Sequence, residues 1–355
     1  MSKILLIYFV LLLGCSACQA QKEPTDNTET PYTSYFTGNN EDLVVAPSYG
    51  VTMMGGRSEH DEAMKWFLRK ANGGDILVLR ASGSDGYNNY LFSELGVEVN
   101  SVESLVVDNV EAANHPYVVD KIEKAEAIWM AGGNQWNYVG LWGNSPMKKA
   151  LNDHINVKKG VIGGTSAGMA VLGEWNFSAE NGSISSAEAL ANPYHEKLKL
   201  DNDFLIIDIL KNTITDTHYA DRDRQGRHSS FMARMATETN KRVYGIACDE
   251  YTAVCVDETG IAKIFGKAPH RSNAVYFIQT NCTSEFTPEQ LGENEPLTWN
   301  RNNQSLVVYK VIANDGTTET FDLNNWKQGS RGEWKYWYIE NGQWYETEGE
   351  QPQCN

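Results

Sequence analysis

The sequence is short of cationic residues and of cysteines. Its 30 lysines and arginines stand against 46 aspartates and glutamates, which leaves a formal net charge of −16 over 355 residues. A nucleic-acid partner requires a basic surface that neutralises phosphates, so this charge argues against one. The six cysteines lack the spacing of a zinc site, and no segment repeats at a fixed period. The 41% of hydrophobic residues suffices for a large core, so the chain is not disordered and has one or two domains.

The apolar run at the amino terminus is too short to span a bilayer. Lys3 precedes an apolar stretch over residues 4–13, which has the pattern of an export signal. Residues 12–15, L-L-G-C, look like a bacterial lipobox, in which Cys15 becomes the lipidated mature terminus. Cys18 fits less well, and an ordinary signal peptide cleaved near Ala20 is the alternative. We expect an exported lipoprotein that meets the membrane through its lipid anchor only, on the periplasmic side or at the cell surface.

Composition divides the chain into four parts. Residues 1–18 are the expected signal peptide, and residues 19–40, rich in Thr, Pro, Glu and Asn, are an expected flexible tether. Residues 41–270 form the main domain, and residues 271–355 form a Trp- and Tyr-rich β extension. Beyond the leader lie Cys248, Cys255, Cys282 and Cys354. An oxidising compartment can pair this even number, the pairing stays open, and buried free thiols are the alternative.

Strand and helix patterns alternate through the main domain. Short apolar runs over residues 75–80, 104–107, 127–130 and 161–162 predict buried strands. Residues 64–71 show helical spacing. A second helix starts at Ser145 and Pro146, where a capping residue is followed by proline, and we expect His154 on this helix to be structural. The fold class is therefore α/β, with a mainly parallel sheet covered by helices on both faces and active-site residues at the carboxyl ends of strands.

One serine stands at the end of a predicted strand. Residues 160–162 run into G-T-S-A-G at 164–168 and then into a helical stretch, so Ser166 occupies a strand-to-helix turn. In such a nucleophile elbow, small flanking residues let the backbone turn sharply, and the N–H groups that follow can stabilise an oxyanion.

A serine nucleophile needs a base, and His218 is the best candidate. It lies in T-I-T-D-T-H-Y at 213–219 and precedes three arginines, Arg222, Arg224 and Arg227. This mixed-charge segment is commonly a solvated face with internal ion pairs. The functional alternative is an anion pocket, because guanidinium groups bind carboxylates through two hydrogen bonds.

Three motifs together resemble the cyanophycinase and dipeptidase E serine peptidases. They are G-G-T-S-A-G-M-A at 163–170, A-G-G-N-Q at 131–135 and D-T-H-Y-A-D-R-D-R-Q-G-R at 216–227, in matching order over about residues 45–270. The resemblance implies a fold similar to class I glutamine amidotransferase domains, with a serine, a histidine and an acid and with no metal or organic cofactor. Cyanophycinases tend to carry glutamine before the catalytic histidine, where Thr217 stands here, which puts cyanophycin itself in doubt as the substrate.

The resemblance also assigns roles to single residues. Ser166 is the nucleophile, His218 the general base, and Gly133 and Ala167 the oxyanion donors. Family positions that line the substrate pocket correspond to Gln135, Asp216, Arg222, Arg224 and Arg227.

The acid of the triad is expected between the serine and the histidine. Glu174, Glu180 and Glu188 stand there, and Glu188 is our choice. The segment D-E-Y-T at 249–252 also resembles a family segment, and we interpret it as structural.

These residues predict a serine-type exopeptidase or amidohydrolase. It would cleave the amide next to an α- or β-linked aspartyl residue of a small peptide, through an acyl-enzyme on Ser166. A surface-anchored lipoprotein that binds a peptide or glycan without catalysis is the alternative. An esterase of the α/β-hydrolase fold fits less well, since that fold places its acid and histidine late in the chain. A monomer and a homodimer both stay open.

Overall fold

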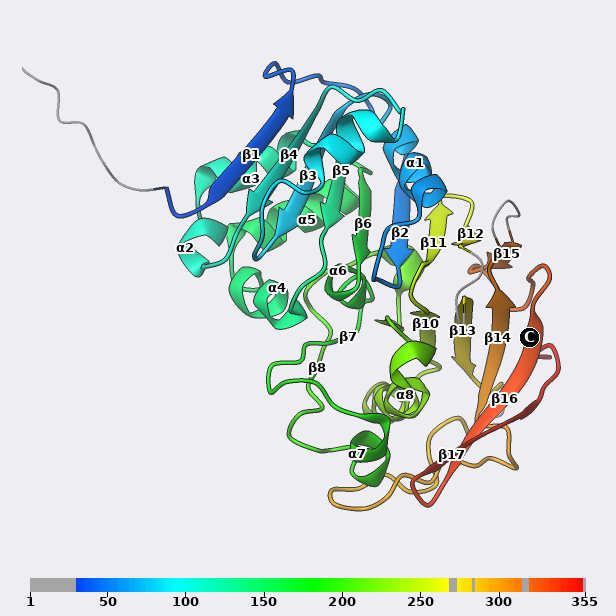
Figure 1. Cartoon of the computed structure of the whole chain (residues 1–355). Coiled ribbons are helices and arrows are strands. Elements are labelled where there is room, and N and C mark those ends of the chain that lie inside the picture. Colours follow the sequence, from blue (N-terminus) through cyan, green and yellow to red (C-terminus); the bar gives the residue numbers. More distant parts are fainter. Residues whose placement is uncertain (1–29, 268–272, 283–284, 315–318, 354–355) are drawn as a thin grey trace, which may run out of the picture. The chain divides into compact units, whose positions relative to one another are not determined.

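The computed structural model describes residues 30–267, 273–282, 285–314 and 319–353. Cys15, the expected signal peptide and Cys354 lie outside these described residues. None of the helices in the described ranges combines the length and the apolar content needed to cross a membrane. The described residues from Pro31 onward form one compact unit, which Figure 1 shows coloured along the chain.

The first sheet has nine strands, in the order β1-β4-β3-β5-β6-β2-β11-β12-β15. Their bounds, in this order, are Thr33–Gly38, Ser101–Val106, Asp75–Arg80, Ala127–Met130, Val161–Thr165, Gly50–Met54, Thr252–Asp257, Ile261–Gly266 and Glu319–Asp322. The five strands from β4 to β2 pair in parallel, whereas β1 and the strands from β11 to β15 join antiparallel. The predicted strands over residues 75–80 and 127–130 are confirmed at their bounds.

The second sheet has six strands, in the order β17-β16-β14-β13-β10-β9. Their bounds, in this order, are Gln343–Glu348, Glu333–Glu340, Leu306–Ile312, Ala274–Thr280, Tyr244–Cys248 and Thr213–Asp216. Only β9 and β10 pair in parallel among them. A short ribbon of β7 (Asn176–Phe177) and β8 (Leu200–Asp201) forms a third sheet. The C-terminal β structure is confirmed, and it extends a sheet that the main domain begins.

Eight α-helices occur in the described residues. They are α1 (Asp61–Lys70), α2 (Val110–Ala113), α3 (Pro116–Lys124), α4 (Gln135–Trp142), α5 (Pro146–Asn156), α6 (Ala167–Ala170), α7 (Ser186–Ala191) and α8 (Gln225–Thr239). The sequence sets α1 well, since acidic residues fill its first turn and basic residues its last turn, which complements the helix dipole. Its apolar stripe includes Phe67 and Leu68, both fully buried, and burying each contributes roughly 1.5–3 kcal/mol.

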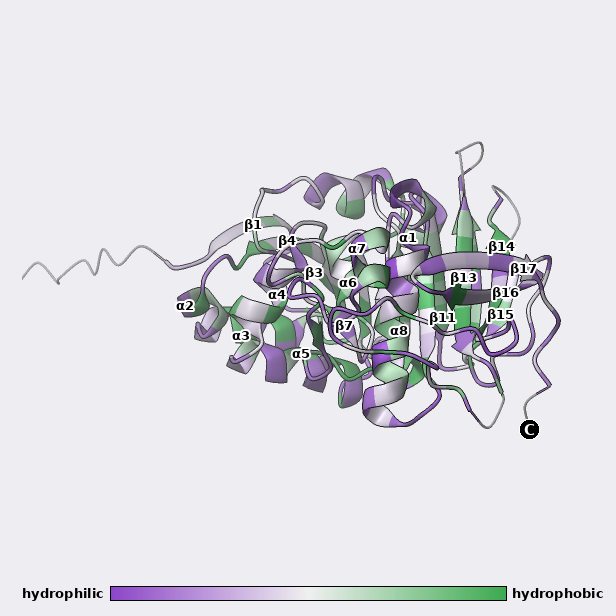
Figure 2. Cartoon of the chain, turned by 90° about the horizontal axis from the view of Figure 1, so that it is seen from below, coloured by the Kyte–Doolittle hydropathy of each residue, from purple (hydrophilic) through white to green (hydrophobic). Residues whose placement is uncertain are grey.

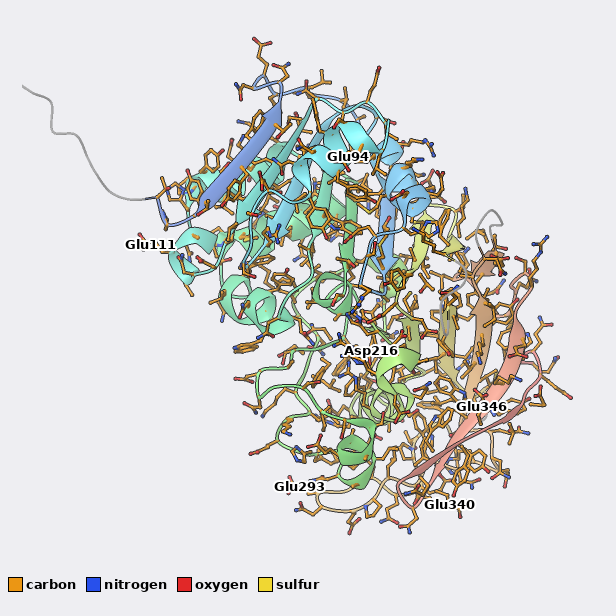
Figure 3. The ribbon with its side chains drawn as sticks, in the orientation of Figure 1. Glu94, Glu111, Asp216, Glu293, Glu340 and Glu346 are labelled. Atoms are coloured by element: carbon orange, nitrogen blue, oxygen red, sulfur yellow. The ribbon has the colours of Figure 1, made fainter. Side chains whose placement is uncertain are left out.

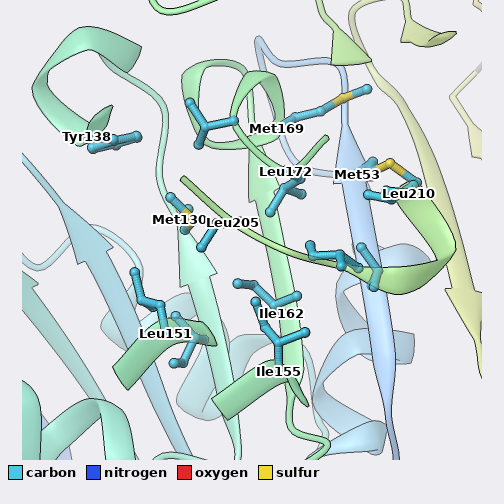
Figure 4. Close-up of a cluster of buried hydrophobic side chains, with 14 of the residues drawn as sticks. Met53, Met130, Tyr138, Leu151, Ile155, Ile162, Met169, Leu172, Leu205 and Leu210 are labelled. Carbon is cyan, nitrogen blue, oxygen red and sulfur yellow. The ribbon is translucent and has the colours of Figure 1, made fainter. Parts of the chain in front are cut away.

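Helices cover both faces of the parallel strands, as the sequence predicts. On β3, Ile76 and Val78 point to the core shared with α1, while Leu77 and Leu79 point to the core shared with α3 and α5. Figure 4 shows part of this second core, where Leu151 and Ile155 of α5 lie beside Ile162 of β6. Figure 2 shows the hydrophobic colour concentrated on the strands and on the inner sides of the helices.

The strands β9, β10, β13 and β14 of the second sheet are also buried on both faces. One face packs on α8, through residues such as Phe231 and Met235. The other face lies on the antiparallel end of the first sheet, where Phe277 of β13 stacks on Phe321 of β15 with ring centroids 4.1 Å apart. The two sheets therefore share a core, and the strands of the C-terminal part are integral to it.

The expected segment boundaries differ from this arrangement at two places. The expected tether reaches residue 40, but Thr33–Gly38 form β1, which pairs along its whole length with β4. Residue 270 does not separate two units either, because β13 pairs with β10 and β15 pairs with β12. Backbone pairing across each boundary makes both corrections necessary.

Two of the cysteines lie in the shared core. Cys248 and Cys255 are free and fully buried, and burial raises the pKa of the Cys255 thiol to about 12. They are therefore inert thiols of the core and do not pair with each other. Cys282 is disulfide-bonded.

Candidate active site

Ser166 lies on a sharp turn between β6 and α6. Its φ of 52° and ψ of −115° are unusual for a residue with a side chain, as expected for a nucleophile elbow. The turn needs glycine on both sides. A Cβ on Gly168 would lie 2.0 Å from the carbonyl oxygen of Met130, and a Cβ on Gly164 would lie 2.5 Å from the carbonyl carbon of Gly168. The predicted strand, turn and helix are confirmed.

His218 reaches Ser166 from the second sheet. It follows β9 with a φ of 44°, and its N–H donates to the carbonyl oxygen of Gly55 at 2.9 Å. The imidazole Nε2 lies 2.8 Å from the Ser166 Oγ, close enough for proton transfer between them.

Glu250 holds the other side of the imidazole. Its Oε1 lies 2.7 Å from the His218 Nδ1, and its own N–H donates to the Asp221 carboxylate at 3.0 Å. Glu250 follows β10, which pairs in parallel with β9, with Ala247 opposite Asp216. Because the carboxyl ends of parallel strands meet at one edge, Glu250 and His218 come together there.

The expectation that Glu188 is the acid is therefore corrected to Glu250. Glu188 is the third residue of α7, where it forms a capping box with Ser185 and an ion pair with Lys197 at 2.8 Å. The bonds from Lys197 and Ser185 lower the pKa of Glu188 to about 2. Its carboxylate caps the start of α7 and does not contact His218.

The two other expected acids also lie away from His218. Glu174 accepts the N–H of Asn212 at 2.5 Å, and Glu180 is an exposed residue of a turn. Asp249 and Glu250, in the segment at 249–252, have different roles. Asp249 is structural, since its carboxylate accepts the N–H groups of Ala220 and Ala274, whereas Glu250 belongs to the site.

The surroundings of His218 favour its neutral form. Burial lowers the pKa of the imidazole, the hydrogen bond with Glu250 opposes this, and the charges of Arg222 and Arg224 lower the pKa further. A neutral imidazole is the form that can accept the proton of Ser166.

Gly133 and Ala167 lie beside Ser166, where the sequence places the oxyanion donors. Both line the same hollow as Ser166 and His218. Within the described residues, neither backbone N–H donates a hydrogen bond to another group. Two unpaired donors at the nucleophile are the arrangement that an oxyanion hole requires.

Asp216 and two of the three arginines form a buried ion cluster. Arg227 binds the Asp216 carboxylate through Nε at 2.9 Å and Nη2 at 2.6 Å, and Arg224 adds Nη1 at 3.2 Å. Burial raises the pKa of Asp216, but the two guanidinium groups outweigh it and lower this pKa to about 2. Figure 3 labels Asp216 near the middle of the drawing, whereas Glu111, Glu293 and Glu340 lie at its periphery.

The cluster changes the roles expected of these residues. Asp216 supports Arg224 and Arg227 from behind, and it is not among the residues that line the hollow. The Nε and Nη2 groups of Arg227, which could otherwise bind a substrate carboxylate through two hydrogen bonds, already bind Asp216. Arg222 is exposed and lines the hollow, and in the described part of the chain its side chain has neither a hydrogen bond nor an ion pair. Gln135 begins α4 and donates to the carbonyl oxygen of Phe177 at 3.2 Å.

The hollow in front of Ser166 has a volume of about 290 Å³ and is positively charged. Three guanidinium groups line it, and Asp216, the carboxylate that pairs with Arg224 and Arg227, stands behind them. Its lining also includes Gly133, Asn134, Gln135, Ala170, Ala179, Gly182, Ser183 and Thr217. Across the described ranges, no group of three or more His, Cys, Asp or Glu side chains is arranged to hold a metal ion.

Comparisons with known proteins show what the chain is similar to. The chain matches Peptidase family S51 over residues 48–264. A cyanophycinase of Geminocystis herdmanii is 27% identical over 177 residues, which cover 50% of this chain and 59% of the relative. A cyanophycinase of Nostoc sp. is 24% identical over 208 residues, which cover 59% of this chain and 62% of the relative. The chain thus spans about three fifths of the length of these relatives. A solved peptidase from an acI-B1 Actinobacterium covers 77% of this chain and 97% of its own, at 15% identity and a TM-score of 0.48.

The family match covers more than half of the chain, so the chain belongs to Peptidase family S51. The matched residues 48–264 include Ser166, His218 and Glu250.

Proposed function

We propose that the protein is a serine-type exopeptidase or amidohydrolase that cleaves an amide next to an α- or β-linked aspartyl residue. The observation that carries this proposal is the chain of hydrogen bonds from Glu250 through His218 to Ser166 at the mouth of a cationic hollow. A nucleophile, a base and an orienting acid in contact are what acyl transfer needs.

The chemistry proceeds in two halves. In the first, the His218 Nε2 takes the proton of Ser166 while the Oγ attacks the amide carbonyl, and the N–H groups of Gly133 and Ala167 stabilise the oxyanion. Glu250 stabilises the imidazolium, which then gives its proton to the leaving amine as the C–N bond breaks. In the second half, His218 activates a water molecule that releases the acyl group from Ser166.

The positive charge of the hollow favours a substrate that has a carboxylate on its acyl side. Arg222 is the arginine with its guanidinium open to solvent, and Arg224 keeps part of its fork unoccupied. Burial lowers the pKa of Arg224 to about 10, so this guanidinium remains charged at neutral pH. A charged guanidinium favours a ligand carboxylate, and an aspartyl side chain or terminal carboxylate supplies one.

The test is the release of amino acid from a panel of α-aspartyl dipeptides and β-aspartyl-arginine. Wild type is expected to cleave at least one member, and Ser166→Ala is expected to lose several orders of magnitude in turnover. Reaction of wild type with a serine-directed fluorophosphonate, checked by intact mass, is the matched measurement without a peptide. Binding of peptides without cleavage and without fluorophosphonate labelling would replace the proposal by the non-catalytic binding lipoprotein.

We also propose that Cys15 carries the lipid anchor of an exported protein, on the sequence pattern of residues 3–15. Metabolic labelling with a fatty acid should mark wild type and leave Cys15→Ser unlabelled, with Cys18→Ser as the matched control. Labelling that is lost only in Cys18→Ser would move the anchor to that residue.

A further inference from the structure

The two large sheets have four outer strands, and the outer edges of three of them are protected. On β15, the N–H of Asp322 donates to the carbonyl oxygen of Gln328 at 2.8 Å, so the segment that follows the strand covers its edge. On β9, the carbonyl oxygen of Thr213 accepts the N–H of Trp175 at 3.0 Å. The outer strand β17 carries exposed glutamates at two of its six positions. Covers and charges of this kind keep edge strands from pairing with other chains.

The outer edge of β1 has neither kind of protection. Among the strands of the described ranges, β1 pairs only with β4, and Figure 1 shows it as the outermost strand of its sheet. Thr33–Gly38 contain no charged residue and no proline, although the whole chain has a net charge of −16. The nearby charges of Lys121 and Glu103 form an ion pair at 2.9 Å. The six residues of β1 therefore offer their backbone to another strand without charge repulsion.

Exposed apolar side chains lie on this edge and at both of its ends. Phe36, on the strand itself, is 38% exposed. Near the start of the strand, Val110 is 54% exposed, and the residue before it donates a side-chain hydrogen bond to the carbonyl oxygen of Pro31 at 2.8 Å. Beyond the other end, Leu43 and Val44 are 41% and 85% exposed, and the N–H of Leu43 donates to the first residue of β3 at 3.1 Å.

We infer that two copies of this chain pair through β1, antiparallel and about a two-fold axis. An antiparallel pair places the start of one strand beside the end of the other. Val110 of one copy then comes to the side on which Leu43 and Val44 of the other copy lie, and the axis repeats this contact. The surface is thus complementary to itself, as a two-fold interface requires.

A second copy fits this edge because neither strand of the pair carries a charge, whereas most of the surface of so acidic a chain repels itself. The strand lies outside residues 48–264, which match the family, so the inference concerns a feature of this chain. It does not depend on the proposed function. Because β1 runs antiparallel to β4, the parallel strands of the two copies run in opposite directions, and the two Ser166 sites open at opposite edges of the joined sheet.

Sedimentation velocity of residues 19–355, which contain every described residue, tests the pairing. Wild type should sediment with twice the mass of the chain at high concentration and shift toward the monomer on dilution. Phe36→Lys adds a like charge to both strands of the pair and should weaken the dimer roughly tenfold or more. Val44→Lys should weaken it as well, and this substitution leaves the core intact because Val44 is 85% exposed.

Tyr345→Lys is the matched control, because Tyr345 is an exposed aromatic residue on the outer strand β17 of the other sheet. This variant should dimerise as wild type does. A wild type that stays monomeric at the highest soluble concentration would overturn the inference. So would a dimer that neither Phe36→Lys nor Val44→Lys weakens, and a dimer weakened by Tyr345→Lys alone would move the contact to β17.

Hydrogen exchange reports on the strand itself. In a pair of β1 strands, the N–H groups that point away from β4 gain an acceptor, so exchange over residues 33–38 should slow as the protein concentration rises. Dilution and Phe36→Lys should both restore fast exchange. A dimer whose exchange over residues 33–38 is independent of concentration would show that the copies meet elsewhere and that the inference is wrong.

Discussion

Replacing Glu250 by glutamine isolates the charge of the acid that the structure assigns to His218. The side chains of His218 and Glu250 are 8% and 13% exposed, so solvent screens their interaction little. A hydrogen bond to a charged group in such a place contributes about 1.5–3 kcal/mol, which corresponds to a loss of roughly tenfold to a hundredfold in kcat.

Glutamine adds a second loss through the imidazole tautomer. Its amide N–H₂ can donate to the His218 Nδ1, which moves the ring proton to Nε2 and removes the acceptor for the Ser166 proton. A comparable exchange in serine proteases lowers kcat by about 10⁴, so we expect Glu250→Gln to fall between roughly 10² and 10⁴. The assay is kcat on the best aspartyl dipeptide, with a thermal melt to show that the variant is folded.

Glu188→Gln is the matched control, since it removes the carboxylate that the sequence pattern favours. Its kcat should stay at the wild-type value, because Glu188 only caps α7 and pairs with Lys197. A Glu250→Gln variant that keeps more than about a tenth of wild-type kcat would refute the assignment, and so would an equal loss in both variants.

Three further predictions concern pH and packing. Burial and the charge of Arg222 lower the pKa of His218, so the acid limb of the pH profile of kcat/KM should lie below the ordinary value of about 6.5. Arg222→Gln should move this limb to higher pH, and an unmoved limb would contradict the prediction. Gly56→Ala should lower kcat because its Cβ would meet the His218 ring at 2.5 Å, whereas Gly86→Ala, with open space around it, should not, in parallel assays and melts. His154 and His228 are buried, with pKa values lowered to about 4, so the unfolded state binds protons at these residues first as the pH falls. The free energy of unfolding, measured with denaturant, should therefore fall by about 3 kcal/mol for each residue between pH values of about 6.5 and 4. A constant free energy of unfolding over that window would exclude this effect of the two histidines.

The turn at Ser166 is predictable from sequence because its causes are local. The strand, the flanking glycines and the helix lie within ten residues of each other, and each leaves its own pattern. His218 is predictable through its motif, and the structure brings it within 2.8 Å of Ser166.

Glu250 escapes sequence reasoning because its place depends on strand pairing. Nothing in the residues states that β10 adds in parallel beside β9, and only that pairing brings position 250 to His218. Two signals were available. The segment D-E-Y-T resembles a family segment, and it directly follows an apolar run that ends at Cys248. An acid at the carboxyl end of a buried strand is a better candidate than Glu188 at a helix start.

The added β structure was predictable in type but not in its attachment. Aromatic runs and the turn at Asn341 and Gly342, with φ of 46° and 75°, indicate a hairpin, and β16 and β17 form it. The sequence does not reveal that this hairpin continues the sheet that contains β9 and β10, because edge pairing follows from packing rather than from local pattern.

The nucleophile follows a strand of one sheet, and the base and the acid follow strands of the other. Catalytic activity therefore depends on how the two sheets pack against each other. Ser166 ends β6 of the first sheet, while His218 and Glu250 follow β9 and β10 of the second. A protein that has formed each sheet, but not yet closed the core around Phe277 and Phe321, would possess every reacting group and still be inert. Recovery of activity during refolding should then lag behind recovery of secondary structure. Substitutions in that remote aromatic core would tune the rate without touching any atom of the chemistry.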